Sequence, residues 1–350
     1  MDSEAEFRGG QEALLMLARG LAARGHRQLL VTPKGSALDQ RAREAGLSTV
    51  PLTSGPWSLL RLVRDFDVIH THSGRAQTPV RLLGPVLRAV RVATRHVAFE
   101  PSNRVIHGWK YGRGCDGVIA VSEAVRKILL RAGVSDSKIE VITTGVELPS
   151  TLPTAEERAS ACAALHLGES DFVIGHMGAF TPEKGQDIAV RAAALVRESL
   201  PQARFVLAGD GPLAAALREL AQREKARVEF PGFLADRSEF FAALDVFIMP
   251  SRAEAWGLAA LEAMAHGVPV IASNVGGLQE IVSPEGGGRL VPPDDAGALA
   301  DAIRDAAGDR ERLRACGLKG RERARKFSTQ QTVDRTEAFY RRLLNAARAR

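Results

Sequence analysis

The sequence predicts an α/β protein built from two Rossmann-like domains that face each other across a cleft. Short apolar runs alternate with longer stretches in which apolar residues recur at helical spacing, the pattern of parallel strands covered by helices. The alternation begins twice, before and after a stretch rich in Pro, Ser and Thr at 148–170. A chain of 350 residues suits two domains of ~100–200 residues each. We expect an N-terminal domain at 1–150, a C-terminal domain at 151–328 and a terminal helix at 329–350.

Apolar runs with the length of buried strands occur in both halves of the chain. They lie at 27–32, 66–72, 91–96, 117–122 and 139–145, and at 171–178, 203–211, 228–233, 246–251, 269–273 and 289–292. Strands buried on both faces of a parallel sheet show such continuous apolar runs. In open sheets of this kind ligands bind beyond the carboxyl ends of the strands, so functional residues should follow the runs directly.

Composition excludes several classes of protein. No apolar run reaches the ~18 residues of a membrane span, and the acidic start "MDSEAEF" is not a signal peptide. The three cysteines are too scattered for a disulfide framework or a metal cluster, so the cytoplasm is the expected compartment. Aromatic residues make up only 5%, and no basic and aromatic stripe appears, which argues against a nucleic-acid partner.

The positive charge of the chain lies in its first half. Residues 1–150 carry 21 Lys and Arg against 14 Asp and Glu, while the remainder carries 26 against 27. A basic half can attract an anionic partner such as a phospholipid surface or a phosphorylated glycan. The alternative is arginine spread over solvated faces, and the sequence leaves the two open.

Two glutamates stand eight positions apart in an apolar stretch. Glu254 lies in the loop after the run at 246–251, and Glu262 lies inside the helix that follows, which Gly257 and Gly267 bracket. A buried carboxylate is costly unless it is hydrogen-bonded, but it can accept bonds from a pair of sugar hydroxyls. The alternative for Glu262 alone is a solvent-facing helix residue.

Glycines and one lysine mark candidate phosphate contacts. Gly276 and Gly277 follow the run at 269–273 and can bring backbone N–H groups close to phosphate oxygens. Lys184 in "TPEKG" can neutralise a diphosphate, and the pair Gly9 and Gly10 precedes a predicted helix. The stretch "AGDGPL" lacks the spacing of a dinucleotide-binding loop.

Three histidines follow strands of the first half. His70 and His72 end one run and His96 ends another, so we expect His72 or His96 to touch ligand. A single histidine is more often structural. No carboxylate or cysteine completes a metal-binding set, and we expect no metal.

These motifs together resemble the GT-B glycosyltransferases of family 4, retaining enzymes that use nucleotide-sugar donors. The resemblance runs through "RGGQEALLMLARGLAARGH", "DVIHTHSGR", "VIAVSEAVR", "TPEKGQD", "VLAGDGP", "VEFPGF", "DVFIMPSRAEAWGLAALEAMAHGVPVIAS" and "GGLQEIV", and it includes the family's E-x7-E signature. It implies that Glu254 holds hydroxyls of the transferred sugar and Glu262 the donor ribose. Lys184 would neutralise the diphosphate, and Gly276 and Gly277 would approach phosphate or sugar through backbone N–H groups.

The same resemblance implies further roles. The base would lie against Gly232 and Phe233, His96 would sit near the reacting sugar, and Gly9 and Gly10 would form a loop between donor and acceptor. The family needs no metal or other cofactor, and its terminal helix crosses back onto the N-terminal domain. The expected acceptor is a glycan or a lipid-linked glycan of the cell envelope, met in the cytoplasm or on the inner face of the membrane. The leaving phosphate would take the acceptor's proton, so the glutamates position the sugar and are not a glycosidase pair.

The sequence departs from the family pattern in two places that matter. Ala179 stands where many members carry an arginine, so one diphosphate cation is missing or comes from elsewhere. No apolar run precedes the loop at Gly9, and we expect a native start ~5–10 residues upstream, because a gap within a sheet leaves buried backbone groups unsatisfied. The alternatives are an impaired paralogue that binds nucleotide sugars and a sugar-nucleotide epimerase or phosphorylase on the same scaffold. The E-x7-E block argues against the epimerase.

Overall fold

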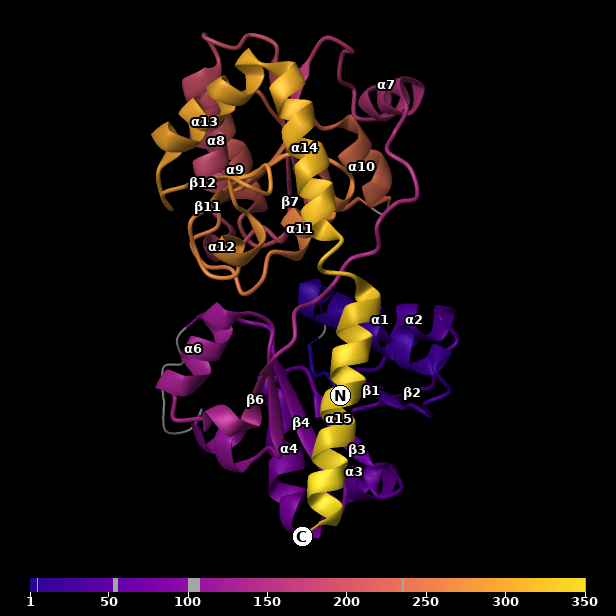
Figure 1. The fold of residues 1–350 in the computed structure, drawn as a ribbon. Helices are drawn as coiled ribbons and strands as arrows, with labels where there is room; N and C mark the ends of the chain where they lie inside the picture. The colour runs from indigo at the N-terminus through magenta and orange to yellow at the C-terminus, as the bar shows by residue number, and fades with distance from the viewer. Residues whose placement is uncertain (5, 53–55, 100–107, 235, 350) are drawn as a thin grey trace. The chain divides into compact units, whose positions relative to one another are not determined.

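The structure is a computed structural model that describes residues 1–350 except 5, 53–55, 100–107, 235 and 350. The chain divides into two compact units (Figure 1). The N-terminal unit contains Met1–Gly145 and Phe327–Arg350, and the C-terminal unit contains Val146–Lys326. The expected boundaries near residues 150 and 328 lie within a few residues of these.

The N-terminal unit holds two parallel sheets. Its strands are β1 (Leu30–Thr32), β2 (Thr49–Pro51), β3 (Val68–Thr71), β4 (Val90–Arg95), β5 (Gly117–Ala120) and β6 (Ile139–Val141). Its helices are α1 (Gly9–Ala23), α2 (Ala37–Glu44), α3 (Pro56–Val63), α4 (Gly74–Leu83), α6 (Glu123–Arg131) and α15 (Thr329–Arg348), with short turns η1 (Gly84–Val86), η2 (Trp109–Arg113) and η3 (Asp136–Lys138). β1 pairs with β2, and the other four strands pair in the order β3-β4-β5-β6. The sequence analysis did not predict strand β2.

The C-terminal unit holds one six-stranded parallel sheet in the order β12-β11-β10-β7-β8-β9. Its strands are β7 (Phe172–Met177), β8 (Ala203–Ala208), β9 (Val228–Gly232), β10 (Val246–Met249), β11 (Val270–Ser273) and β12 (Arg289–Val291). Its helices are α7 (Ala155–Ala164), α8 (Gln186–Val196), α9 (Ala214–Arg223), α10 (Arg237–Ala243), α11 (Leu258–Ala265), α12 (Leu278–Ile281), α13 (Ala296–Gly308) and α14 (Arg310–Ala324), with the turn η4 (Pro182–Lys184). The six runs predicted here coincide with these strands. The strand order reverses between β7 and β10, which is where ligands bind in sheets of this type.

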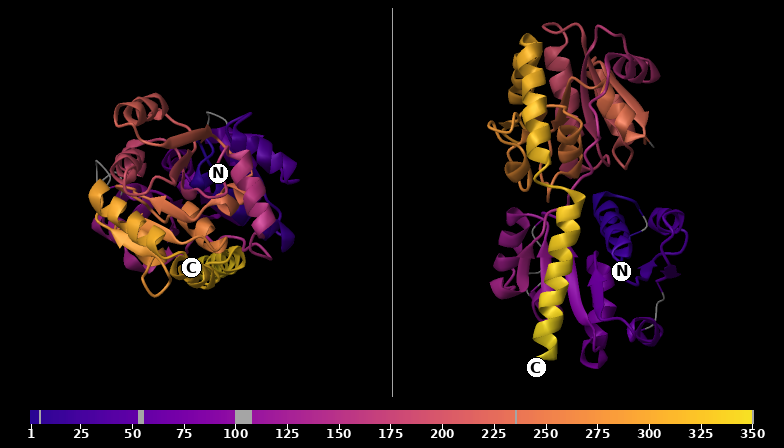
Figure 2. Two further views of the ribbon diagram at one scale, coloured as in Figure 1. Left: turned by 90° about the horizontal axis from the view of Figure 1, so that it is seen from above. Right: turned by 45° about the vertical axis from the view of Figure 1, so that its right-hand side comes forward.

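Helix α15 follows the C-terminal unit in sequence but packs on the N-terminal one. Its Phe339 is 3% exposed and lies in a core cluster with Val92 and Ile142. Gly117 makes room for it, because a Cβ there would lie 2.5 Å from the ring of Phe339. Figures 1 and 2 show this helix in yellow beside the elements of the N-terminal unit, where it contacts α1 and β4.

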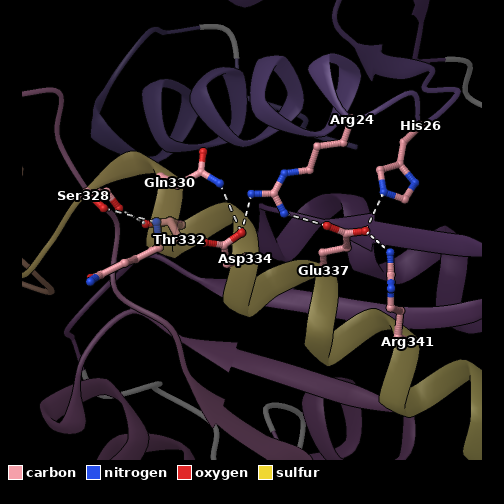
Figure 3. Close-up of polar contacts among 9 residues, drawn as sticks. Arg24, His26, Ser328, Gln330, Thr332, Asp334, Glu337 and Arg341 are labelled. Atoms are coloured by element: carbon pink, nitrogen blue, oxygen red, sulfur yellow. Dashed lines mark hydrogen bonds and ion pairs between the residues drawn. The ribbon is translucent and has the colours of Figure 1, made fainter.

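A polar network fixes α15 to the end of α1 (Figure 3). Arg24 Nη1 donates to Glu337 Oε2 at 2.6 Å, and the same guanidinium bonds Asp334. The other oxygen of Glu337 accepts from Arg341 at 2.6 Å and lies 3.2 Å from His26 Nε2. The hydrogen bond from Arg24 is the main reason why the pKa of Glu337 falls to about 2.

Replacement of Glu337 by Gln should destabilise the N-terminal unit in a pH-dependent way. The pKa of Glu337 in the folded protein lies below that of a free glutamate. The stabilisation that the network gives to the folded state is therefore fully present above the unfolded pKa of 4.5, and it is lost as pH falls towards 2. We expect Glu337→Gln to lower the Tm by about 2–4 °C at pH 6. The difference in Tm between the variant and the unmodified protein should shrink progressively between pH 5 and pH 3.

Glu44→Gln, an exposed residue of α2, serves as the control and should change the Tm little at any of these pH values. A gap that stays constant for Glu337→Gln down to pH 3 would contradict the assigned role of its charge.

Candidate active site

A cation and a carboxylate meet where the strand order reverses. Lys184 ends the turn η4 after β7, and Glu254 lies in the loop after β10. Lys184 Nζ lies 2.6 Å from Glu254 Oε2, and their side chains are 24% and 10% exposed. Ser251 Oγ also donates to Glu254 Oε2, at 3.5 Å. Two residues that the sequence singled out 70 positions apart therefore form one charged pair.

Glycines allow the loops around this pair to touch through their backbones. Gly185 has a φ of +67°, and a Cβ there would lie 2.0 Å from the carbonyl oxygen of Pro250. Gly276 has a φ of +51°, and a Cβ there would lie 1.9 Å from the carbonyl oxygen of Glu254. An L side chain is strained at such φ values even without a clash. The two glycines thus bring the loops after β7 and β11 against the loop after β10.

The backbone of Gly277 has a partner inside the protein. Its N–H donates to the carbonyl oxygen of Glu254 at 3.0 Å, which speaks against the predicted phosphate contact through this group. A Cβ at Gly277 would lie 2.5 Å from the carbonyl oxygen of Ala255, so the position serves loop packing. A ligand contact through the N–H of Gly276 stays a prediction.

Glu262 is held by a residue that the sequence did not point to. Arg237 Nη1 donates to Glu262 Oε1 at 2.8 Å and to Oε2 at 3.2 Å. Arg237 is the first residue of α10, which begins after the N-cap Asp236. Glu262 is the fifth residue of α11, little more than one turn from its start. A carboxylate has about four acceptor positions, and the two bonds from Arg237 fix the orientation of this one.

Gly232 ends β9, and the exposed aromatic ring of Phe233 follows it directly. Gly232 has a φ of +80° with open space where a Cβ would stand, and Phe233 is 61% exposed. An aromatic face on the surface offers a stacking partner for a planar base. The predicted base contact at these two residues stays a prediction.

A buried histidine supports the loop that carries Lys184. His176, in β7, is fully buried, and its Nδ1 lies 3.0 Å from the carbonyl oxygen of Ile248. Gln186 Nε2 lies 3.2 Å from His176 Nε2 and donates to the carbonyl oxygen of Ala179 at 2.8 Å. Burial lowers the pKa of His176 to about 4, so it is neutral at pH 7. The contacts tie β7, β10 and the start of α8 together, and sequence reasoning missed them.

In the N-terminal unit, His96 lies against the predicted glycine pair. Gly9 and Gly10 are the first residues of α1 and not a loop before it. A Cβ at Gly10 would lie 3.4 Å from Cβ of His96. His96 Nε2 lies 3.2 Å from His72 Nδ1, and burial lowers the pKa of His96 to about 4. His96 is therefore neutral at pH 7 and can donate or accept one further hydrogen bond.

His70 has a structural setting in the same cluster. Its Nδ1 lies 2.5 Å from Tyr340 Oη and its Nε2 lies 2.7 Å from Thr94 Oγ1. Both ring nitrogens are thereby engaged between α15 and β4. Burial holds the pKa of His70 and of His72 well below its usual range. In the described part of the chain no three His, Cys, Asp or Glu side chains lie close enough together to hold a metal.

Substitution of Gly276 should separate backbone packing from backbone strain. Gly276→Ala forces a Cβ into the carbonyl of Glu254, and we expect a loss of at least about 3 kcal/mol in the free energy of unfolding. Gly232→Ala is the matched control, since its φ is also positive but no atom lies within 4 Å of the new Cβ. That control should lose only about 1 kcal/mol. Urea unfolding of both variants gives the comparison, and equal losses would contradict the packing role of Gly276.

Comparisons with known proteins identify the family of the chain. A family model described as "Glycosyltransferase Family 4" matches residues 7–149, and one described as "Glycosyl transferases group 1" matches residues 171–309. The GDP-mannose-dependent alpha-(1-6)-phosphatidylinositol monomannoside mannosyltransferase of Mycobacterium tuberculosis H37Rv is 32% identical, over 90% of each chain. The D-inositol 3-phosphate glycosyltransferase of Nocardia farcinica is 32% identical, over 77% of this chain and 65% of that protein.

The fold has a close counterpart among solved structures. The structure of HepE from Anabaena in complex with UDP and glucose has a TM-score of 0.88, covering 97% of this chain and 98% of that one at 21% identity. This likeness supports the GT-B arrangement of two Rossmann-like domains. The two family matches and the relatives at 32% identity show that the chain belongs to the glycosyltransferases of family 4 and that it is a glycosyltransferase.

Proposed function

We propose that this enzyme takes a hexose from a nucleoside diphosphate sugar and transfers it, with retention of configuration, to a hydroxyl group of a lipid-linked or phosphorylated envelope acceptor. The observation that carries the proposal is the contact of 2.6 Å between Lys184 and Glu254 at the strand reversal. A cation for a diphosphate and an acceptor for sugar hydroxyls stand side by side there. A donor with a sugar joined directly to a diphosphate needs that combination.

The charges on the reacting bond explain why a lysine is needed. Departure of a nucleoside diphosphate builds negative charge on its outer phosphate and positive charge on the anomeric carbon. Lys184 would neutralise the first, and Glu254, 2.6 Å from it, would hold sugar hydroxyls beside the second. Because Glu254 already fixes the Lys184 side chain, the cation needs little reorganisation when the donor arrives.

The second carboxylate is suited to the other end of the donor. Glu262, oriented by Arg237, would take the paired hydroxyls of a ribose. The exposed ring of Phe233 offers a stacking surface for the base. Glu254 and Glu262 would then hold two separate parts of one ligand.

Proton transfer in this proposal uses the donor itself. The leaving phosphate accepts the proton of the attacking hydroxyl on the same face of the sugar, so the reaction calls for no metal or other cofactor. His96, neutral at pH 7, can hydrogen-bond a sugar hydroxyl but is a poor proton acceptor with a pKa of about 4.

The relatives indicate which substrates to try first. The mannosyltransferase from Mycobacterium tuberculosis is named for GDP-mannose and phosphatidylinositol monomannoside, and the glycosyltransferase from Nocardia farcinica is named for D-inositol 3-phosphate. We propose GDP-mannose as the first donor and an inositol phosphate or phosphoinositide as the first acceptor.

Thermal-shift measurements against GDP, UDP, ADP and their sugars, followed by transfer of a labelled sugar, test the proposal. A nucleotide that binds at 100 times its Kd should stabilise the protein by about 2.7 kcal/mol. Tight binding without transfer to any acceptor would favour an impaired nucleotide-sugar-binding paralogue instead.

Removal of the Lys184 charge should abolish most turnover. We expect Lys184→Met to lower kcat by about 10²–10³, the range seen when one group that stabilises a developing charge is lost, and Lys184→Arg to retain part of the activity. The measurement is labelled-sugar transfer per folded enzyme.

Arg158→Met provides a matched control for this substitution. Arg158 Nη2 lies 2.8 Å from Asp245 Oδ2, and the two side chains are 30% and 13% exposed. This pair lies by the amino ends of β7 and β10, at the other end of these strands from Lys184 and Glu254. Both methionine variants should lower the Tm, but only Lys184→Met should lose turnover. Full turnover in folded Lys184→Met would refute the role of the lysine.

A face of the N-terminal unit suits contact with an anionic membrane. Leu82 and Val86 are 65% and 58% exposed on α4 and η1, and Trp109 of η2 is 38% exposed. The guanidinium of Arg81 lies 4.7 Å from the Trp109 ring centroid, and both η1 and η2 pack against α4. Residues 74–91 contain four arginines and no acidic residue. Apolar side chains set among arginines are typical of interfacial segments.

No helix among the described residues combines the length and the apolar character that crossing a bilayer requires. A membrane-bound acceptor would therefore be met through this peripheral face.

Vesicle cosedimentation tests the membrane contact. Leu82→Ser combined with Arg88→Glu should weaken binding to vesicles of 30% phosphatidylglycerol at least about tenfold, because a basic residue near an anionic surface contributes ~1 kcal/mol and its reversal about twice that. Leu318→Ser with Arg314→Glu on α14 is the matched control and should bind like the unmodified chain. Equal binding by both double variants, or no preference for anionic lipid, would contradict the proposal.

A further inference from the structure

Arg252 joins the two loops that carry the charged pair of the candidate active site. It lies two residues before Glu254 in the loop after β10, and its N–H donates to the carbonyl oxygen of Glu183 in η4 at 2.8 Å. Its side chain returns to the same turn, because Nη1 donates to the carbonyl oxygen of Pro182 at 2.8 Å. Lys184 is the last residue of η4. The main chain and the side chain of one arginine therefore both hold the turn that ends in the lysine.

Two carboxylates fix the guanidinium of Arg252. Nη1 and Nη2 donate to the two oxygens of Asp187 at 2.9 and 2.7 Å, a fork of charge-assisted bonds. Nε donates to Asp294 Oδ1 at 2.5 Å. Asp187 is the second residue of α8, and Asp294 lies in the loop after β12. The guanidinium thus connects the turn after β7, the start of α8 and the loops after β10 and β12, all within the C-terminal unit.

These contacts favour a supporting role for Arg252 over direct contact with a donor. All three nitrogens of its guanidinium donate to acceptors of the protein. One guanidinium and two carboxylates also give the cluster of Arg252, Asp187 and Asp294 a net negative charge, which repels a diphosphate. Arg252 therefore does not replace the cation that Ala179 leaves missing.

Lys184 needs such support because its charge sits at the end of a long stem. A lysine carries a compact charge on four flexible carbons, so the place of Nζ depends on where the turn lies and on the bond of 2.6 Å to Glu254. A shift of about 1 Å in a group that acts on the reacting atoms can lower a rate by about 10². A residue that fixes η4 against the loop after β10 can therefore control turnover without touching the substrate.

We propose that Arg252 is a positioning residue of the transfer reaction. By clamping η4 to the loop after β10, it holds Lys184 beside Glu254, where the lysine meets the leaving diphosphate. The proposal rests on the proposed function, because it concerns how the lysine of that site is placed.

Replacement of Arg252 by Met removes the clamp and keeps an apolar stem. With GDP-mannose as the first donor, we expect Arg252→Met to lower the kcat of labelled-sugar transfer by about 10- to 100-fold, because Lys184 loses its place. The KM for the donor should change by at most about threefold, since an interaction used mainly in the transition state is lost.

Arg304→Met is the matched control. Arg304 lies in α13 of the same unit, is 35% exposed against 32% for Arg252, and donates through its three nitrogens to Ser199 Oγ, Asp301 and the carbonyl oxygen of Leu195. Both methionine variants should lower the Tm by a similar amount, but only Arg252→Met should lose turnover. Equal kcat values for the two folded variants would overturn the proposal.

A double variant tests whether Arg252 acts through Lys184. With both residues replaced by Met, kcat should equal that of Lys184→Met within about twofold, because no lysine is left to be placed. Losses that multiply would show that Arg252 acts independently of the lysine, and they would overturn the proposal. Asp187→Asn breaks the fork while Arg252 stays, so it should lower kcat in the same direction. Unchanged turnover in this variant would also count against the clamp, even if Arg252→Met did not fold.

The outcomes separate this inference from the proposed function. An unmodified enzyme that transfers no sugar, or a folded Lys184→Met with full turnover, would refute the proposed function and this inference with it. A large loss in Lys184→Met together with full turnover in Arg252→Met would overturn the inference alone.

Discussion

The candidate active site depends on the close approach of three backbone loops at the carboxyl ends of β7, β10 and β11. A Cβ at Gly185 or Gly276 would lie within 2.0 Å of a carbonyl oxygen of the loop after β10, so these contacts exist only because the positions are glycine. The N–H of Gly277 adds a hydrogen bond to the carbonyl oxygen of Glu254. The placement of Lys184 against Glu254 follows from this packing of main chain. Substitutions that leave both side chains intact can therefore destroy their geometry.

Each of the two carboxylates of the site forms an ion pair with a cation of the protein. Lys184 holds Glu254, and Arg237 holds Glu262 in a fork of two hydrogen bonds. Partly buried charges are costly without a partner, and the pairs offset that cost before any ligand binds. They also fix the side chains in one arrangement, which reduces the ordering that a donor must bring about. Arg237 bears on the question that Ala179 raised, because it is a further cation of the C-terminal unit, beside Glu262, and does not lie near Ala179 in sequence.

The sequence predicts the C-terminal sheet better than any other part of the molecule, for a physical reason. Strands buried on both faces are continuous apolar runs, and the inner strands β7, β8, β10 and β11 have that character, whereas the edge strands β9 and β12 are partly exposed. Strand β2 spans only three partly exposed residues, so it leaves no such run. The pair of Arg237 and Glu262 spans 25 positions with no periodic signal, and only the path of the chain from β9 to α11 brings it together. The hydrogen bonds of Met1 with His70 and His72 of the β3 region are equally invisible in the sequence, because the polar residues around Met1 carry no strand pattern.

The chain passes between the two units twice, after Gly145 and before Phe327, and both passages leave the N-terminal unit at the same place. Thr332 Oγ1 accepts from the N–H of Gly145 at 2.8 Å and donates to the carbonyl oxygen of Thr143 at 2.8 Å. A Cβ at Gly145 would lie 2.2 Å from the backbone of Ser328, so the outgoing and returning chains touch there through main chain. Since α15 is locked to its own unit by Phe339 and the Glu337 network, that crossing point is fixed on one side. Any change in the relative orientation of the units must then be absorbed by the few residues that follow Gly145 and precede Ser328, as hinges at element ends commonly do.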